Sequence, residues 1–144
     1  MILVVIDTNI FISGFLNPKG KPYAIVDLIL EEKLILLLSP QIMDEIKRVC
    51  HYEHIIKLIE KGGKTVKDVE QYIDKIRQIA LIMLGNLQVN AIENDPSDNM
   101  FLACALEGKA DYIVSGDSHL LDLKSFQGIK IVPPDEFLKI VKNG

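Results

Sequence analysis

Short apolar runs alternate along this chain with longer stretches in which apolar residues recur every three to four positions. The apolar runs predict strands, at residues 2–6, 34–38, 112–114 and 129–132. The periodic stretches predict helices, at residues 10–15, 23–32, 40–49, 53–61, 65–83, 98–107 and 135–142. Strands that alternate with helices predict an α/β domain with a central, mainly parallel sheet.

Two helix starts carry clear local signals. Ser39 before Pro40 is a good start, because serine caps a helix and proline suits the first helical position. Thr65 with Asp68 resembles a capping box, with aspartate in the usual place of glutamate. Both signals indicate where the chain leaves a loop and enters a helix.

The weaker elements are expected near the edges of the sheet. Lys130, together with the two prolines that follow residue 132, indicates that 129–132 is an edge strand. Residues 87–89 fit one more short strand. Neither a repeat, nor a low-complexity tract, nor a linker divides the sequence, so residues 1–144 are expected to form a single domain.

Composition is that of an ordinary globular domain. Hydrophobic residues make up 49% of the sequence, enough to fill a core, and the charged fraction of 25% does not indicate disorder. The apolar runs are too short to span a membrane and the N-terminus lacks a basic leader, so we expect a cytoplasmic protein with no membrane partner. Cys50 and Cys104 form no CxxC pair, and Cys104 is expected in the core.

The formal net charge of −4 argues against a protein that holds nucleic acid through one broad basic patch. This acidic excess is no larger than one cluster of four carboxylates, which a bound divalent ion would screen. The charge therefore weakens a nucleic-acid function without excluding it.

Three carboxylates are predicted to meet at the carboxyl edge of the sheet, where α/β proteins bind ligands. Asp7 and Asp117 each follow a predicted strand, and Glu45 lies in the second turn of a helix that begins at that edge. Each has an ordinary alternative. Asp7 and Asp117 suit helix N-caps, and Glu45 can pair with Arg48 three residues on.

Asp98 is the most informative carboxylate. It shares one face of a predicted helix with Phe101, Leu102 and Ala105, and the other faces of that helix are also apolar. A capping pair with Asp95 would be a sufficient structural reason for an acid there. However, a carboxylate on an apolar face is costly unless it is paired, hydrogen-bonded or bound to metal, and no lysine or arginine lies close to it in sequence.

Four carboxylates in one pocket would raise one another's pKa, and a divalent cation removes that cost. Oxygen ligands without cysteine or histidine favour Mg²⁺ or Mn²⁺ over Zn²⁺. An ion held in this way orients and acidifies a water molecule and stabilises charge on a leaving oxygen, which suits phosphoester hydrolysis.

The ordered set of residues resembles that of the PIN-domain nucleases, from residue 2 to about 138. The resemblance rests on VVIDTN at 4–9, Ser39-Pro40 before the helix that bears Glu45, DNMFLACA at 98–105 and ADYIVSGDSHL at 110–120. It implies a three-layer α/β/α fold and a ribonuclease that cuts single-stranded RNA with metal-activated water. Matched residue by residue, the catalytic and metal-binding positions are Asp7, Glu45, Asp98 and Asp117.

Within that family the chain is similar to the toxins of prokaryotic toxin–antitoxin pairs. The resemblance implies Asn9 and Ser115 as supporting polar residues, a cognate antitoxin as partner, and a homodimer. Phosphate contacts supply much of the affinity for RNA, and five residues are candidates for them: Lys19, Lys21, Lys47, Arg48 and His119. Most surface lysines only solvate a protein. Contact with a metal-bound water is a further role for His119, and a surface role suits it equally well.

Other interpretations are open. Cys50, His51 and His54 suggest a metal clip, although solvated or helix-terminal roles suit them better. A catalytically inactive PIN-like module that binds RNA or protein is the main alternative, disfavoured because all four acidic positions are filled. A receiver domain would need paired acids after the first strand and a lysine after the last. A phosphatase would need an aspartate where Asn9 stands.

Overall fold

The computed structural model of the chain describes residues 1–93 and 96–143, and a six-stranded sheet in the order β3-β2-β1-β4-β6-β5 lies at its centre. The strands are β1 (Leu3–Ile6), β2 (Ile35–Leu38), β3 (Leu81–Ile82), β4 (Tyr112–Val114), β5 (Ser125–Phe126) and β6 (Ile129–Val132). Neighbouring strands are parallel except for β5, which is antiparallel to β6. The expected α/β fold with a mainly parallel sheet is therefore confirmed.

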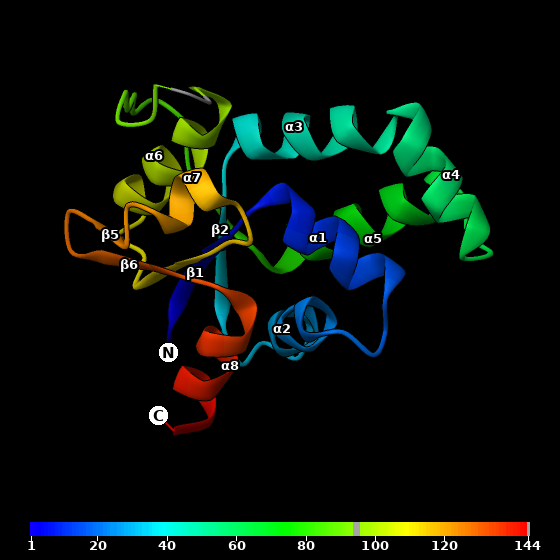
Figure 1. Ribbon diagram of the computed structural model, residues 1–144, viewed down its shortest axis with the longest axis horizontal. Coiled ribbons are helices and arrows are strands. Elements are labelled where there is room, and N and C mark those ends of the chain that lie inside the picture. Colours follow the sequence, from blue (N-terminus) through cyan, green and yellow to red (C-terminus); the bar gives the residue numbers. More distant parts are fainter. Residues whose placement is uncertain (94–95, 144) are drawn as a thin grey trace.

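Helices cover both faces of this sheet (Figure 1). On one face lie α1 (Thr8–Leu16), α2 (Lys21–Leu30) and α8 (Pro134–Asn143), and on the other lie α6 (Asn99–Glu107) and the short α7 (Ser118–Leu121). A helical extension projects to one side and consists of α3 (Pro40–Cys50), α4 (Glu53–Lys61) and α5 (Val66–Ile79). The layers are those of the expected α/β/α sandwich.

The central strands are buried on both faces, because parallel strands joined by helices are covered from each side. Val4 and Val5 of β1 and Leu37 of β2 are all 0% exposed. The apolar stripe of α5, predicted to lie in the core or a dimer interface, is buried within this chain at Val69 and Ile76.

The two predicted helix starts form as expected. The Ser39 hydroxyl accepts a hydrogen bond from the N–H of Ile42 at 3.3 Å, with Pro40 at the first position of α3. Thr65 and Asp68 form a capping box with both reciprocal bonds present. Because α3 begins directly after β2, its first turns are set at the carboxyl edge of the sheet.

The segment after α5 differs from the prediction. The helix ends at Ile79 rather than near residue 83, and the strand lies at Leu81–Ile82 rather than at 87–89. Pairing of this strand with Leu37 and Leu38 of β2 overrides the helical period of the local sequence.

An irregular loop follows β3 and is held by side chains of α3 and α6. Gln41 donates to the carbonyl of Gly85 at 2.7 Å, and Glu107 accepts from the N–H of the same glycine at 3.3 Å. Asn99 accepts from the N–H of Ile92 at 2.8 Å and donates to its carbonyl at 2.9 Å. These bonds fix the loop against the start of α6.

The strand at 129–132 is not the sheet edge that its lysine predicted. Ser125–Phe126 pairs outside it as β5, through a turn in which Gln127 and Gly128 both have positive φ, 48° and 86°. Such a two-residue turn suits a tight hairpin. The helix predicted from residue 98 begins with a short 3₁₀ turn, Pro96–Asp98, and the proposed capping partner Asp95 lies outside the described residues.

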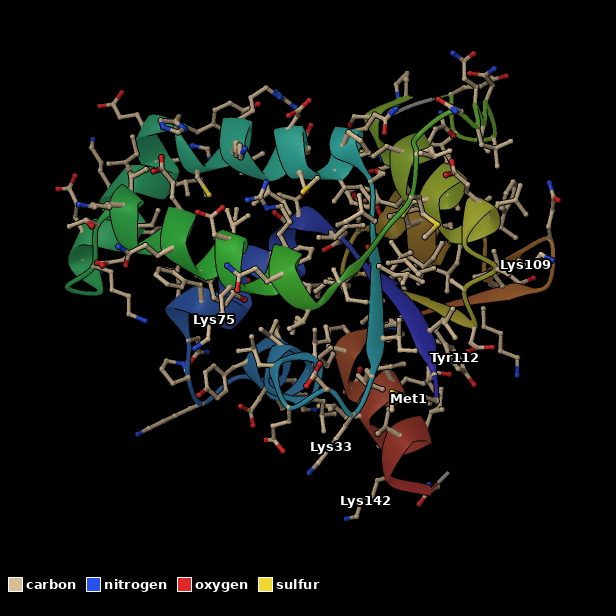
Figure 2. All side chains as sticks on the ribbon, turned by 180° about the vertical axis from the view of Figure 1, so that it is seen from behind. Met1, Lys33, Lys75, Lys109, Tyr112 and Lys142 are labelled. Carbon is tan, nitrogen blue, oxygen red and sulfur yellow. The ribbon has the colours of Figure 1, made fainter. Side chains whose placement is uncertain are left out.

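Of the lysines labelled in Figure 2, Lys75 and Lys109 lie on opposite sides of the view, whereas Lys33 and Lys142 both lie at its lower end. Among the helices of the described residues, none is long and apolar enough to cross a membrane.

Candidate functional site

A cavity of about 150 Å³ lies at the carboxyl ends of β1 and β4, next to the first turns of α3 and α6. The four carboxylates selected from the sequence all line it: Asp7, Glu45, Asp98 and Asp117. Its lining is completed by Thr8, Asn9, Val49, Ser97 and Phe101. The fold thus brings together acids that are up to 110 positions apart in the sequence.

Asp7 is held in place by hydrogen bonds on both carboxylate oxygens. It caps α1, with Oδ1 accepting from the N–H of Ile10 at 2.9 Å. Oδ2 accepts from the Ser115 hydroxyl and from the N–H of Gly116. Burial raises the pKa of Asp7 above its usual value, although these hydrogen bonds oppose the rise and the charge of Asp117 adds to it.

Asp117 is the N-cap of α7, as its position after β4 suggested. Its Oδ1 accepts from the N–H of His119 at 2.7 Å. Its own N–H donates to the Ser115 hydroxyl at 2.9 Å. Ser115, which is 0% exposed, therefore links Asp7 to Asp117, so the hydroxyl predicted as a supporting group is a structural bridge between two acids.

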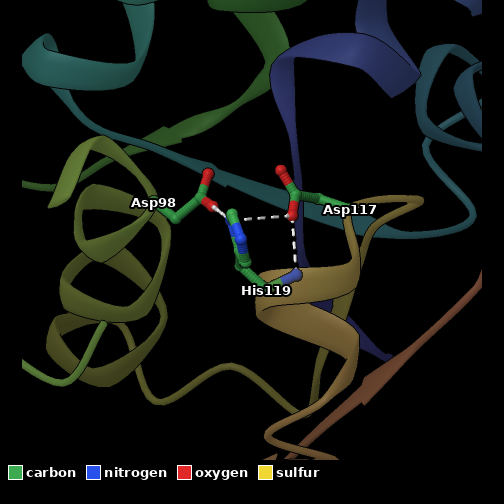
Figure 3. A group of neighbouring side chains, drawn as sticks. All are labelled: Asp98, Asp117 and His119. Atoms are coloured by element: carbon green, nitrogen blue, oxygen red, sulfur yellow. Dashed lines mark hydrogen bonds and ion pairs between the residues drawn. The ribbon is translucent and has the colours of Figure 1, made fainter. Parts of the chain in front are cut away.

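Asp98 ends the short 3₁₀ turn and is 6% exposed. It lines the cavity together with Phe101, three residues further on, so the helical face identified in the sequence is the one turned to the cavity. The imidazole of His119 lies between Asp98 and Asp117 (Figure 3). Its Nδ1 is 3.8 Å from Asp98 Oδ2 and 3.6 Å from Asp117 Oδ1.

Glu45 approaches the cavity from α3 and is also ion-paired. Its carboxylate contacts the guanidinium of Arg48 at 2.5 Å, and Arg48 donates a second hydrogen bond to the hydroxyl of Tyr52. The pairing that was the ordinary alternative for Glu45 therefore coexists with its place in the cavity lining.

One group of donor atoms lies close enough together to share a metal ion among the described residues, and it includes a histidine. Single ligand atoms of Asp98, Asp117 and His119 all lie within 4.8 Å of one another. Sequence reasoning considered His119 as a surface residue or as a contact to RNA phosphate or a metal-bound water, and not as a ligand of the metal. The available signal was its place two residues after a strand-ending aspartate, at the start of a helix.

Arg48, through its ion pair with Glu45, is the one other predicted RNA contact beside the cavity, and the predicted lysines are not gathered here. Lys19 and Lys21 lie beyond the far end of α1 from Asp7, and Lys47 borders a separate hollow with Glu70 of α5. Asn9 is exposed and lines the cavity.

The suggested clip of Cys50, His51 and His54 does not form. Cys50 is buried, His51 Nδ1 lies 2.7 Å from the carbonyl of Lys47, and His54 stacks on Tyr52.

Comparisons with known proteins agree with this fold. A family model described as the PIN domain matches residues 3–119. The uncharacterized protein MJ1680 of Methanocaldococcus jannaschii is 34% identical over 146 residues, covering 96% of this chain and 90% of that protein. The crystal structure of VapBC2 from Rickettsia felis bound to a DNA fragment from their promoter contains a chain with the same fold. The TM-score is 0.58 at 11% identity, covering 92% of this chain and 98% of that one.

Proposed function

Because the chain belongs to the PIN-domain family, we propose that it is a metal-dependent endoribonuclease that hydrolyses phosphodiester bonds of single-stranded RNA. The observation that carries this proposal is the convergence of four carboxylates on one small cavity at the carboxyl edge of the sheet. Proteins of this family are generally nucleases, and carboxylates arranged around a cavity are suited to phosphoester hydrolysis.

The donor set fits a hard divalent cation such as Mg²⁺ or Mn²⁺. Asp7 and Asp98 are buried carboxylates in the lining of one cavity with two more acids, and a divalent cation offsets the mutual repulsion of their negative charges. In this proposal Asp7, Glu45, Asp98 and Asp117 hold the ion. When bound, such an ion supplies an acidified water and stabilises the negative charge on the leaving oxygen.

The residues around the acids prepare the cavity. Ser115 and the N–H of Gly116 fix the orientation of Asp7, and the same hydroxyl positions Asp117. Exposed Asn9 at the lining is available to orient a phosphate oxygen or a water. A cavity of about 150 Å³ admits a phosphate group but not a nucleotide, so the RNA backbone approaches from outside.

A toxin of a toxin–antitoxin pair is the proposed biological role, with a cognate antitoxin protein as partner and the cytoplasm as its place of action. The sequence resemblance to such toxins supports it, as does the fold shared with a chain of the VapBC2 structure. A homodimer is also proposed. The exposed apolar side chains of Leu81, Ile82 and Leu84 beside the β3 edge offer a surface for it.

The test is cleavage of a panel of labelled single-stranded RNAs with Mg²⁺, with Mn²⁺ and with EDTA. We expect metal-dependent cutting by the wild type and none by Asp98→Asn. Asp74→Asn removes an exposed acid on α5 and serves as the charge-matched control, with activity unchanged. Cutting by the Asp98→Asn variant would overturn the site assignment. Metal binding without cutting of any RNA would point to another substrate. The absence of both would favour the inactive binding module.

A further inference from the structure

We propose that His119 is a ligand of the metal through Nδ1, and that this nitrogen makes the site prefer Mn²⁺ over Mg²⁺. The inference rests on the proposed function, because it concerns the ion of the same site. It changes the expected chemistry, since the sequence suggested oxygen ligands alone.

Distances around the imidazole suit a shared ion better than direct hydrogen bonds. Nδ1 lies 3.6 Å from Asp117 Oδ1 and 3.8 Å from Asp98 Oδ2, beyond the usual range of about 2.7–3.2 Å. Ligand atoms at roughly 2.0–2.3 Å from one ion are separated by distances of this order. The three side chains converge from α6 and α7 (Figure 3).

The burial of polar atoms supports an occupant between these groups. Nδ1 of His119 is buried and has no hydrogen-bond partner within residues 1–93 and 96–143, although the side chain as a whole is 40% exposed. The hydroxyl of Thr8, a residue that lines the cavity and is 7% exposed, likewise has no hydrogen-bond partner in the described part of the chain. Buried polar atoms are nearly always satisfied, so the Thr8 hydroxyl in the cavity lining and Nδ1 of His119 beside Asp98 and Asp117 of that lining indicate a polar occupant.

The fold fixes the backbone of His119 next to the two acids. Its N–H donates to Asp117 Oδ1 at 2.7 Å, so the carboxylate that caps α7 is tied to the backbone of this residue. The following residue, Leu120, is 0% exposed and anchors the short helix in the core. The Cα of His119 is therefore held where its imidazole reaches both Asp98 and Asp117.

A nitrogen ligand changes which ions bind well. Mg²⁺ prefers oxygen ligands and keeps much of its water, whereas imidazole is a common ligand of transition ions. One imidazole beside the carboxylates of the site therefore favours Mn²⁺ over Mg²⁺, and affinity should rise further from Mn²⁺ to Co²⁺.

The experiment measures Mn²⁺ and Mg²⁺ binding by calorimetry, and nitrogen coupling to bound Mn²⁺ by pulsed electron paramagnetic resonance. The variant His119→Asn keeps an oxygen close to the place of Nδ1, and His119→Ala removes the donor. His54→Asn, an exposed histidine on α4, is the matched control. Asp98→Asn tests the metal site itself.

We expect nitrogen coupling in the wild type and in His54→Asn, and its loss in both His119 variants. The Kd for Mn²⁺ should rise about tenfold or more in His119→Ala, while His119→Asn should mainly lose the preference for Mn²⁺ over Mg²⁺. Mn²⁺ binding without nitrogen coupling, unaffected by His119→Asn, would overturn the inference and leave the proposed nuclease intact. Failure of the wild type to bind Mn²⁺ would overturn both.

Discussion

The two flanks of the cavity hold their carboxylates in different ways. On the strand flank, Asp7 follows β1 directly and Asp117 lies three residues after the end of β4, and Ser115 hydrogen-bonds to both residues. On the helix flank, Glu45 reaches in from α3 and is paired with Arg48. Asp7 is 4% exposed, whereas the side chains of Glu45 and Arg48 are 15% and 55% exposed.

The carboxylates of the strand flank are fixed in position, whereas the carboxylate of the helix flank can exchange its partner. The strand flank is locked by backbone N–H groups and one buried hydroxyl, so its acids need no reorganisation to receive an ion. The helix flank already has a cation, and its carboxylate must exchange or share that partner. Exposed ion pairs are worth little, about 0–1 kcal/mol, so this exchange is easy. We therefore expect substitutions on the strand flank to have larger effects.

The largest effect is expected for Asp7→Asn. Asparagine still accepts the bond from Ile10 as an N-cap, so the fold should persist while the charge is lost. RNA cleavage should fall by about a hundredfold or more in a metal-dependent assay. Circular dichroism checks the fold. Residual cleavage within tenfold of the wild type would show that the strand flank is not the centre of the site.

A smaller loss is expected for Glu45→Gln, because the helix flank supplies the adjustable ligand. Cleavage should fall about tenfold and recover in part at higher Mn²⁺ concentration. Asp44→Asn, an exposed acid on the same helix, is the matched control and should leave cleavage unchanged. A loss as large as that of Asp7→Asn would erase the distinction between the flanks.

Ser115 tests how the strand flank is locked. Ser115→Ala removes the donor to Asp7 and the acceptor for the N–H of Asp117, so we expect a stability loss of about 1–3 kcal/mol. Cleavage should fall by a few-fold. Ser115→Thr keeps the hydroxyl and should retain most cleavage. The stability of both variants is measured by urea unfolding, and their activity by RNA cleavage. Equal stability and equal cleavage of the two variants would mean that the hydroxyl does not matter.

The buried charge of Asp7 should also appear in the pH dependence of stability without metal. Its pKa is raised in the folded protein, so its contribution to stability is fully present below the unfolded pKa and is lost as pH rises through the folded pKa. In EDTA, the melting temperature of the wild type relative to that of Asp7→Asn should therefore fall as pH rises from about 4 to about 7.5. A constant difference across pH would contradict this origin.

The smallest effect is expected for Arg48→Ala. The substitution releases Glu45 from its ion pair and removes the bond to Tyr52, both at the surface. Cleavage should change by no more than about twofold, and Mn²⁺ binding should be equal or slightly tighter. A large loss of cleavage with unchanged metal affinity would instead assign Arg48 to contact with RNA.

Local patterns predicted much of this molecule. The apolar runs of β1, β2 and β4, the cap at Ser39 and the capping box at Thr65 depend on residues within a few positions of one another, which a sequence displays directly. The meeting of Asp7, Glu45 and Asp117 follows from one further rule, that parallel strands end at a common edge. Their roles in catalysis stay a prediction.

The elements that were wrong depend on distant partners. β3 forms because the backbone of β2 is available for pairing on that side. The side chains of Leu81 and Ile82 remain exposed, so their hydrophobicity does not predict which residues of the two strands pair. β6 pairs with β5 on its outer side through the turn at Gln127. Glutamine seldom indicates a position with positive φ. The place of His119 depends on the direction of α7 relative to α6, which no local pattern contains.

The hydrogen bond between Ser115 and Asp7 determines when, during synthesis of the chain, the site can be completed. It joins residues 108 positions apart, and β1 has β4 as one of its neighbours in the sheet. At about 5–20 residues per second, roughly 5–20 s pass between synthesis of Asp7 and synthesis of Asp117. A nascent chain that has made β1, α1 and β2 therefore carries an incomplete pocket. The proposed nuclease remains silent on the ribosome until β4 has emerged and paired.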